Sequence, residues 1–294
     1  MVQCSDIGYI EGDDMDKERE SKEIVSAVRD RYGSVARQFE SGAGGGCCSP
    51  ASTCCGGGSA SLIQVEALYQ TDDVQQLPAE VTGISLGCGD PVTLAELQPG
   101  QTVLDLGSGG GIDCFLAARQ VGAEGRVIGV DMTAEMIDLA RANAQKMGLS
   151  NVEFRLGEIE HLPVVDQSVD VILSNCVINL SPDKAQVFRE AFRVLRPGGK
   201  LAVSDIVTRA EFPEDVRRDL ESWASCVAGA WVDREYVAAI EAAGFERVGI
   251  EEQALDEAMA AAVTATSSEH GSIPAPAEAQ ALVYSARVTA FKPT

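Results

Sequence analysis

The residues with the clearest chemical potential lie in one glycine-rich run. Positions 103–111 read Val-Leu-Asp-Leu-Gly-Ser-Gly-Gly-Gly, the pattern of a buried strand that carries an acid, Asp105, into a loop. Apolar residues at helical spacing follow. Glycines let a backbone approach a ligand closely, and a helix start offers unpaired N–H donors. We therefore expect Gly107, Ser108 and Gly109 to bind a nucleotide-like cofactor.

Charges around this loop indicate which cofactor it suits. The loop contains no Lys or Arg, and Asp105 would repel a pyrophosphate but attract an ammonium or sulfonium group. Asp131 and Met132 close the next predicted strand, at the position where an acid accepts hydrogen bonds from ribose hydroxyls. These features favour S-adenosylmethionine over NAD.

Cysteines suggest what the cofactor acts on. The chain has nine, an odd number that cannot be fully paired, and a cytosolic protein keeps its thiols reduced. Asn175 and Cys176 follow a predicted strand, where ligands of open α/β sheets bind, so Cys176 is expected to face the cofactor. Cys88 lies in a Gly-Cys-Gly turn and Cys226 on a predicted helix. Three thiolates from separate segments suit a soft, three-coordinate metalloid.

The elements that must position these residues alternate between strand and helix. Such alternation predicts an α/β fold with a doubly wound, mostly parallel sheet. Two closing edge strands are expected at 245–250 and 283–291, which makes seven in all. The other predicted strands are 103–106, 126–130, 152–156, 169–173 and 200–204. The predicted helices are 18–40, 112–118, 134–147, 184–195, 217–230 and 234–243.

Three regions are expected along the chain. Residues 1–60 form a helix followed by a mobile arm, because 41–61 are dominated by Gly, Ser and Cys and cannot bury enough surface to fold. Residues 61–207 form the cofactor-binding core. Residues 208–294 supply further helices and the closing strands, with an Ala-rich and Pro-containing insertion at 251–280.

Composition excludes several classes of partner. A formal charge of −22 disfavours nucleic acid, whose phosphates need Lys and Arg, and equally disfavours anionic membranes. No apolar run approaches the roughly 20 residues that a membrane-spanning helix needs. The acidic N-terminus lacks the pattern of a signal peptide. We expect a soluble cytoplasmic protein, and the sequence does not indicate its oligomeric state.

Residues 97–206 resemble class I S-adenosylmethionine-dependent methyltransferases, which have a Rossmann-like fold. The resemblance rests on residues 103–113, 129–136, 156–160 and 193–205. It implies that the residues after the third strand flank the adenine, with Glu158 on the exocyclic amine and Ile159 on the ring face.

A narrower resemblance, to arsenite methyltransferases, covers roughly residues 32–292. It rests on the Gly-Cys-Gly turn, Ser-Asn-Cys-Val-Ile-Asn-Leu-x-Pro-Asp-Lys, Trp-x-x-Cys-x-x-Gly-Ala and the terminal Ser-Ala-x-Val-x-x-Phe-Lys. It implies that Cys88, Cys176 and Cys226, or a subset, hold trivalent arsenic, as in arsenic detoxification. The arsenic lone pair then attacks the sulfonium methyl group, and S-adenosylhomocysteine leaves.

Methylation formally oxidises arsenic, so a thiol pair must reduce it. The resemblance implies that a further N-terminal cysteine acts with Cys88, and that glutathione or an external dithiol protein such as thioredoxin restores the disulfide. This chain has two vicinal pairs where one cysteine is usual. Cys47 or Cys48 is favoured over Cys54 or Cys55 because the former pair follows the predicted 18–40 helix most closely. A zinc site fits adjacent cysteines poorly, since zinc usually requires spaced ligands.

Two other functions remain open at this point. A carbon methyltransferase acting on a quinone precursor would share the core but leave the cysteine settings unexplained. A thiol-based metalloid-binding or sensor protein would keep the fold without the reaction.

Overall fold

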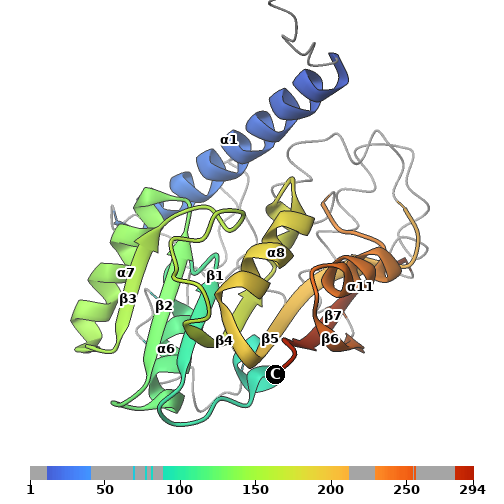
Figure 1. The fold of residues 1–294 in the computed structure, drawn as a ribbon. Coiled ribbons are helices and arrows are strands. Elements are labelled where there is room, and N and C mark those ends of the chain that lie inside the picture. Colours follow the sequence, from blue (N-terminus) through green and yellow to red (C-terminus); the bar gives the residue numbers. More distant parts are fainter. Residues whose placement is uncertain are drawn as a thin grey trace, which may run out of the picture.

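The fold follows from a repeated strand–helix pattern, seen in a computed structural model of the chain (Figure 1). The structure describes residues 12–40 (side chains for 19–38), 69, 77, 81, 89–211, 229–253, 255 and 282–294. These residues form a seven-stranded sheet with the order β3-β2-β1-β4-β5-β7-β6. The strands are β1 (Thr102–Leu106), β2 (Arg126–Asp131), β3 (Val152–Leu156), β4 (Val169–Asn175), β5 (Leu195–Thr208), β6 (Glu246–Gln253) and β7 (Val283–Phe291).

Strands β1 to β5 pair in parallel, and β7 runs antiparallel to both β5 and β6. Helices join the parallel strands, except β3 and β4, which a loop connects, and they cover both faces of the sheet. The helices are α1 (Gly12–Glu40), α5 (Pro91–Ala95), α6 (Ile112–Val121), α7 (Ala134–Met147), α8 (Lys184–Val194) and α11 (Asp233–Ala242), with a 3-10 turn η1 (Ile178–Leu180). This architecture confirms the predicted doubly wound sheet.

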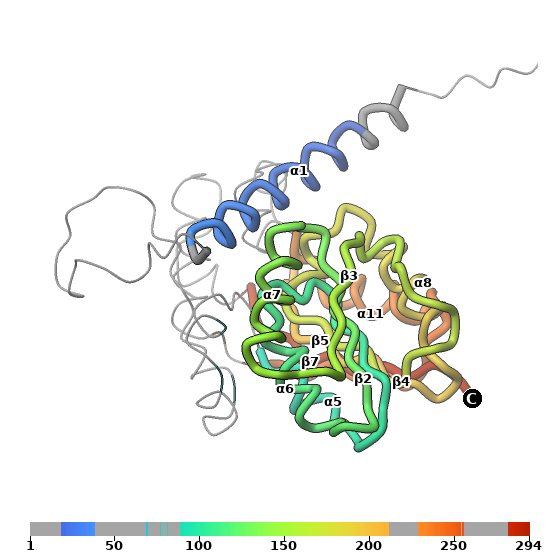
Figure 2. Tube along the Cα trace, turned by 90° about the vertical axis from the view of Figure 1, so that its left-hand side faces the viewer, coloured from blue at the N-terminus to red at the C-terminus, as the bar shows by residue number. Residues whose placement is uncertain are grey.

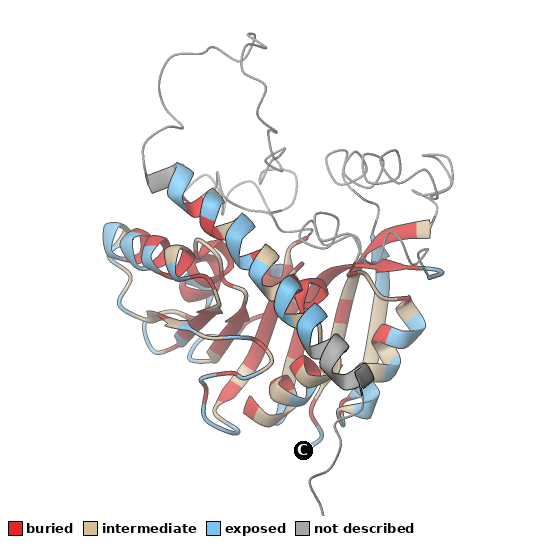
Figure 3. Ribbon diagram, turned by 90° about the horizontal axis from the view of Figure 1, so that it is seen from above, coloured by how far each residue is buried: buried red, intermediate tan, exposed pale blue. Residues whose placement is uncertain are grey.

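Alternating side chains on the strands build two separate cores. On β1, Leu104 and Leu106 pack with α8 and α11, whereas Val103 packs with α5, α6 and α7 on the opposite face. Burial on both faces explains why the central strands are almost continuously apolar. The view from above shows these strands as largely buried (Figure 3).

Helix α1 lies outside this layered core. It packs against α7 and lies beside one end of the sheet in two perpendicular views (Figures 1 and 2). Ile24, Val28 and Ala36 are its buried apolar residues. Arg37 of this helix pairs with Glu135 of α7, and Arg29 Nη2 lies 3.3 Å from Glu158 Oε1.

Three predictions about the elements were wrong. β7 is not an edge strand but lies between β5 and β6. The fifth strand begins at Leu195 rather than Lys200, because Pro197-Gly198-Gly199 lie within the extended segment. The segment 251–253 belongs to β6 rather than to an insertion. The 134–147 helix and the 283–291 strand match their predicted bounds, and the predicted 217–230 helix lies almost wholly outside the described residues.

Candidate active site

The cavity at the carboxyl ends of the parallel strands gathers most of the predicted cofactor residues. It encloses about 1020 Å³, its open mouth included. Ligands of open α/β sheets bind at this position. Of the predicted residues, the lining includes Gly107, Ser108, Gly109, Asp131, Met132, Ile159, Asn175 and Cys176.

The glycine loop needs its glycines for conformation and for space. Gly107 has a φ of 66°, and a Cβ there would lie 2.2 Å from Val177 Cγ2. Gly111 precedes α6 with a φ of 98°, and a Cβ there would lie 2.6 Å from the Phe115 ring. Both positions exclude larger residues. Gly109 has nothing within 4 Å of an added Cβ, so the loop presents open backbone to the cavity.

Asp131 holds the loop to the end of β2. Its Oδ2 accepts from the Gly109 amide at 2.9 Å, and its Oδ1 accepts from the Thr133 amide at 2.8 Å. Burial raises the pKa of this carboxyl, and the Thr133 and Gly109 hydrogen bonds oppose that rise. The Thr133 side chain makes a third hydrogen bond to this carboxyl. A carboxylate offers about four acceptor positions, so one remains for a ligand.

Asp105 lies beneath the loop, and it does not line the cavity. It is 2% exposed, and the Cys114 thiol donates to its Oδ2 at 3.2 Å. Burial raises the pKa of Asp105 well above its usual range, and the charge of Asp113 adds to the effect. Cys114 is a buried free cysteine of α6. Direct contact of Asp105 with a cofactor stays a prediction.

Asp113 is a cavity residue that sequence reasoning missed. It follows the loop on α6 and is only 5% exposed. Tyr69 Oη donates to its Oδ1 at 3.0 Å, and Asn175 Nδ2 lies 3.2 Å from its Oδ2. Burial raises the pKa of Asp113 to about 7. An acid in the first turn of a helix is common for dipole reasons alone, so its type gave no separate signal.

Helix α1 contributes to the cavity as well. Val25, Val28 and Tyr32 line it, a role that the predicted 18–40 helix did not suggest. Glu158, predicted on the adenine amine, is absent from the lining and instead pairs with Arg29 of α1. Its contact with adenine stays a prediction.

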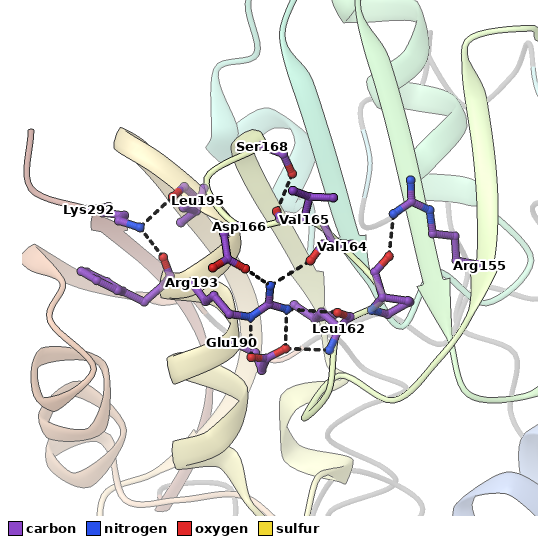
Figure 4. A network of polar contacts seen from close by, with 12 residues as sticks. Arg155, Leu162, Val164, Val165, Asp166, Ser168, Glu190, Arg193, Leu195 and Lys292 are labelled. Atoms are coloured by element: carbon purple, nitrogen blue, oxygen red, sulfur yellow. Dashed lines mark hydrogen bonds and ion pairs between the residues drawn. The ribbon is translucent and has the colours of Figure 1, made fainter.

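The loop after β3, which carries Ile159 and Glu160 into the cavity, is held by a polar network (Figure 4). Arg193 of α8 donates to the carbonyls of Val164 at 2.9 Å and Leu162 at 3.0 Å. Glu190 accepts from Arg193 and from the Leu162 amide, and these contacts hold its pKa below the usual range. The network fixes the loop from outside the cavity.

Cys176 is the predicted thiol that the structure places in the cavity. It is 3% exposed and lines the cavity directly after β4. Its φ of 58° is unusual for a residue with a side chain, and such strain concentrates at functional sites. Its amide donates to the Ser204 carbonyl of β5 at 2.8 Å, and its side chain is disulfide-bonded.

The other predicted cysteines, Cys47, Cys48, Cys54, Cys55, Cys88 and Cys226, lie outside the described residues. Gly89, the residue after Cys88, is described. Its carbonyl accepts from Asn175 Nδ2 at 2.9 Å, and a Cβ there would lie 2.7 Å from Ser204 Oγ. Gly89 therefore lies against Asn175, which precedes Cys176, and against Ser204, whose carbonyl accepts from the Cys176 amide.

Within the part of the chain that the structure describes, no helix has the length and hydropathy to cross a membrane, and no group of three or more His, Cys, Asp or Glu residues has the arrangement of a metal site.

Comparisons with known proteins agree with this geometry. A family model described as a methyltransferase domain matches residues 97–261. An arsenite methyltransferase of Halobacterium salinarum is 48% identical over 235 residues, which are 79% of this chain and 60% of that protein. The human arsenite methyltransferase is 39% identical over 181 residues, 58% of this chain and 48% of that protein. This chain thus matches only about half to 60% of the length of these relatives.

A solved structure extends the match. The arsenic(III) S-adenosylmethionine methyltransferase of Chlamydomonas reinhardtii is similar with a TM-score of 0.60 and 32% identity, covering 79% of this chain and 74% of that one. The chain belongs to the arsenite S-adenosylmethionine methyltransferases, within the class I methyltransferase superfamily.

Proposed function

We propose that this chain transfers a methyl group from S-adenosylmethionine to trivalent arsenic. The observation that carries the proposal is the place of Cys176. Its side chain lines the same cavity as the glycine loop and Asp131, so a thiol-bound substrate and a cofactor would meet there. The quinone-precursor alternative leaves this cysteine without a role.

The cavity residues fit S-adenosylmethionine. Ser108 Oγ is buried without a hydrogen-bond partner among the described residues, and it lines the cavity where a ligand would supply one. Asp131 keeps an acceptor position that suits a ribose hydroxyl. The described lining includes three carboxylates, Asp113, Asp131 and Glu160, and no Lys or Arg. When bound, S-adenosylmethionine supplies an electrophilic methyl group on a cationic sulfonium.

In this proposal the protein binds and orients the reactants and supplies little further chemistry. Thiolates are soft ligands that suit arsenic(III), and we assign Cys176, Cys88 and Cys226 to that task. Arsenic supplies its own lone pair, so the residues need only hold it in line and exclude water. The buried setting of Cys176 and the cover provided by α1 serve that exclusion.

Reduction is the second requirement. A disulfide-bonded Cys176 has no thiolate to offer, so we propose that an external thiol first opens this bond by exchange, becoming oxidised itself. Cys47 or Cys48, together with Cys88, would reduce arsenic after methylation. Glutathione or a thioredoxin-like dithiol would then restore the thiols. Such reductants are maintained in the cytoplasm, where we propose that the enzyme works.

The test is to incubate the full chain with arsenite, S-adenosylmethionine and a thiol reductant, and to measure methylated arsenic and S-adenosylhomocysteine by mass spectrometry. Cys176→Ser is expected to lower the rate about 100-fold or more, the scale of loss when a reacting group is no longer positioned. Cofactor affinity should change little. Cys4→Ser is the matched control and should keep the wild-type rate.

Two results would contradict the proposal. One is a wild-type rate in Cys176→Ser. The other is arsenite binding without any S-adenosylhomocysteine, which would identify a metalloid-binding protein or sensor instead. Omitting the reductant should suppress turnover from the first cycle.

A further inference from the structure

Asp113 is a buried carboxyl that neither the proposed methyl transfer nor the sequence motifs assign to a task. It connects three segments: position 69, the start of α6 and the end of β4. Asn175 Nδ2 lies 2.9 Å from Tyr69 Oη, 2.9 Å from the Gly89 carbonyl and 3.2 Å from Asp113 Oδ2. An amide nitrogen carries two hydrogens, so three acceptors must share them. The longest of the three contacts, to Asp113, is the weakest.

Among the residues that the structure describes, the charges that act on Asp113 are of its own sign. Asp90 raises its pKa by direct repulsion, and Asp113 in turn raises the pKa of Asp105, which also faces Asp131. The titratable neighbours Tyr69 and Cys114 carry no positive charge. Helix α1 contributes only Val25, Val28 and Tyr32 to the lining, and its Arg29 and Arg37 pair with Glu158 and Glu135.

A buried carboxylate without a neighbouring cation is costly, so the group stays partly protonated near neutral pH. Such a carboxyl on a cavity wall would be stabilised in its ionised form by a ligand that brings a positive charge. The ionisation of Asp113 should therefore depend on the charge of the ligand that enters the cavity.

We propose that Asp113 binds a cationic group of the cofactor, and that cofactor binding releases a proton from this carboxyl. The inference rests on the proposed cofactor but not on arsenic chemistry. The cation is either the ammonium group, which S-adenosylhomocysteine shares, or the sulfonium, which it lacks.

The sign of the pH dependence follows from linkage. In the free protein the pKa of Asp113 is about 7, and a bound cation lowers it. Below pH 7 the ligand must displace a proton, so affinity falls as the pH falls. Above pH 7 the carboxyl is already ionised and affinity levels off. For one proton, binding should weaken about five- to tenfold between pH 7.5 and pH 6.

Calorimetric titration of the full chain with S-adenosylmethionine, without arsenite, tests this. Repeating it in buffers of different ionisation enthalpy counts the protons released. We expect close to one proton at pH 6 and almost none at pH 8. A parallel titration with S-adenosylhomocysteine identifies the source: equal release indicates the ammonium group, and release with S-adenosylmethionine alone indicates the sulfonium.

Asp113→Asn keeps the shape of the side chain and removes its titration. It should bind at least tenfold more weakly at pH 7.5 and show no proton release at pH 6. Asp138→Asn is the matched control, because Asp138 lies on α7 with its side chain 71% exposed, and it should keep the wild-type pH profile.

A purely structural Asp113 would leave the proton count unchanged in Asp113→Asn, and that result would overturn the inference. So would the absence of proton release with both ligands in the wild-type chain. Failure of the proposed function is distinguishable, because it would show as a lack of cofactor binding or of arsenic methylation.

Discussion

Two buried aspartates of this chain have similar immediate partners but different surroundings. Asp113 accepts from Tyr69 Oη at 3.0 Å, and Asp205 accepts from Tyr236 Oη at 3.0 Å. Burial raises the pKa of each carboxyl to about 7. Asp113 lines the cavity, whereas Asp205 is fully buried at the end of β5, where Tyr236 of α11 contacts it.

The difference lies in how completely each carboxyl is satisfied. The second oxygen of Asp205 accepts from the Ile206 amide at 3.0 Å, and the buried cation Lys184 lowers its pKa. Asp113 has a shared amide hydrogen and acidic neighbours instead. The same acid–tyrosine pair is therefore structural where it is sealed and charge-compensated. It is available to a ligand where the cavity leaves it open and uncompensated.

The largest expected effect is a loss of stability, which should be greater when Asp205 is removed than when Asp113 is removed. Asp205→Ala leaves the Tyr236 hydroxyl and the Ile206 amide without their acceptor, at about 1–3 kcal/mol for each buried group, so unfolding free energy should fall by about 3–5 kcal/mol. Asp113→Ala should cost about 1 kcal/mol or less, because Asp113 lines the cavity and water there can accept from the Tyr69 hydroxyl in its place. Urea denaturation measures both.

Cofactor affinity should show the reverse order, with Asp113→Ala the weaker binder. Equal losses of stability in the two variants would remove the distinction between the sites. Asp138→Ala serves as the exposed control.

An intermediate effect is expected in the pH dependence of stability. Because both carboxyls have pKa values of about 7 in the folded chain and about 3.9 when unfolded, the folded state binds more protons between these values. Stability should therefore rise as pH falls from 7.5 to 5.5, which thermal unfolding can follow.

Bound cofactor should change this pH dependence of stability. A bound cation favours ionised Asp113, so a fixed saturating concentration of S-adenosylmethionine should raise the melting temperature more at pH 7.5 than at pH 5.5. Asp205→Asn should reduce the pH dependence without altering the cofactor response. A cofactor shift that is independent of pH would contradict the assigned difference.

The smallest effect on cofactor binding is expected for the exposed ion pairs that hold α1 beside the cavity. Arg29 and Glu158 are each 47% exposed, and Arg37 is 56% exposed. Exposed pairs contribute about 0–1 kcal/mol and are screened by salt. Arg29→Gln should weaken cofactor binding no more than about fivefold, less at high salt, with Arg19→Gln on the same helix as control. A loss of affinity as large as that of Asp113→Asn would show that the position of α1, rather than Asp113, dominates cofactor binding.

Much of the fold was predictable because strand–helix alternation and the glycine loop are local patterns. The bounds of α7 follow from its periodicity and from Gly148, which ends it. The place of β7 between β5 and β6 was not predictable, because an alternating strand pattern does not specify its neighbours. The extension of β5 through Pro197-Gly198-Gly199 depends on its pairing partners, while the local sequence favours a turn.

Some residues of the site were likewise predictable from the sequence, and others were not. Asp131 and Cys176 were located by their places after strands, a rule that needs no three-dimensional information. Asp113 was missed because its importance depends on Tyr69 and Asn175, which are distant in sequence, and on a pKa set by burial. The ion pair of Glu158 with α1 likewise depends on packing that no local pattern specifies.

The late position of β7 in the chain has a consequence for synthesis. β5 ends at Thr208, and its antiparallel neighbour begins at Val283. Until β7 has been synthesised, the side of β5 that β7 occupies lacks this partner, and β6 has no partner among the described strands. Contacts between residues so distant in sequence form slowly, so the insertion of β7 between β5 and β6 should be a late step of folding.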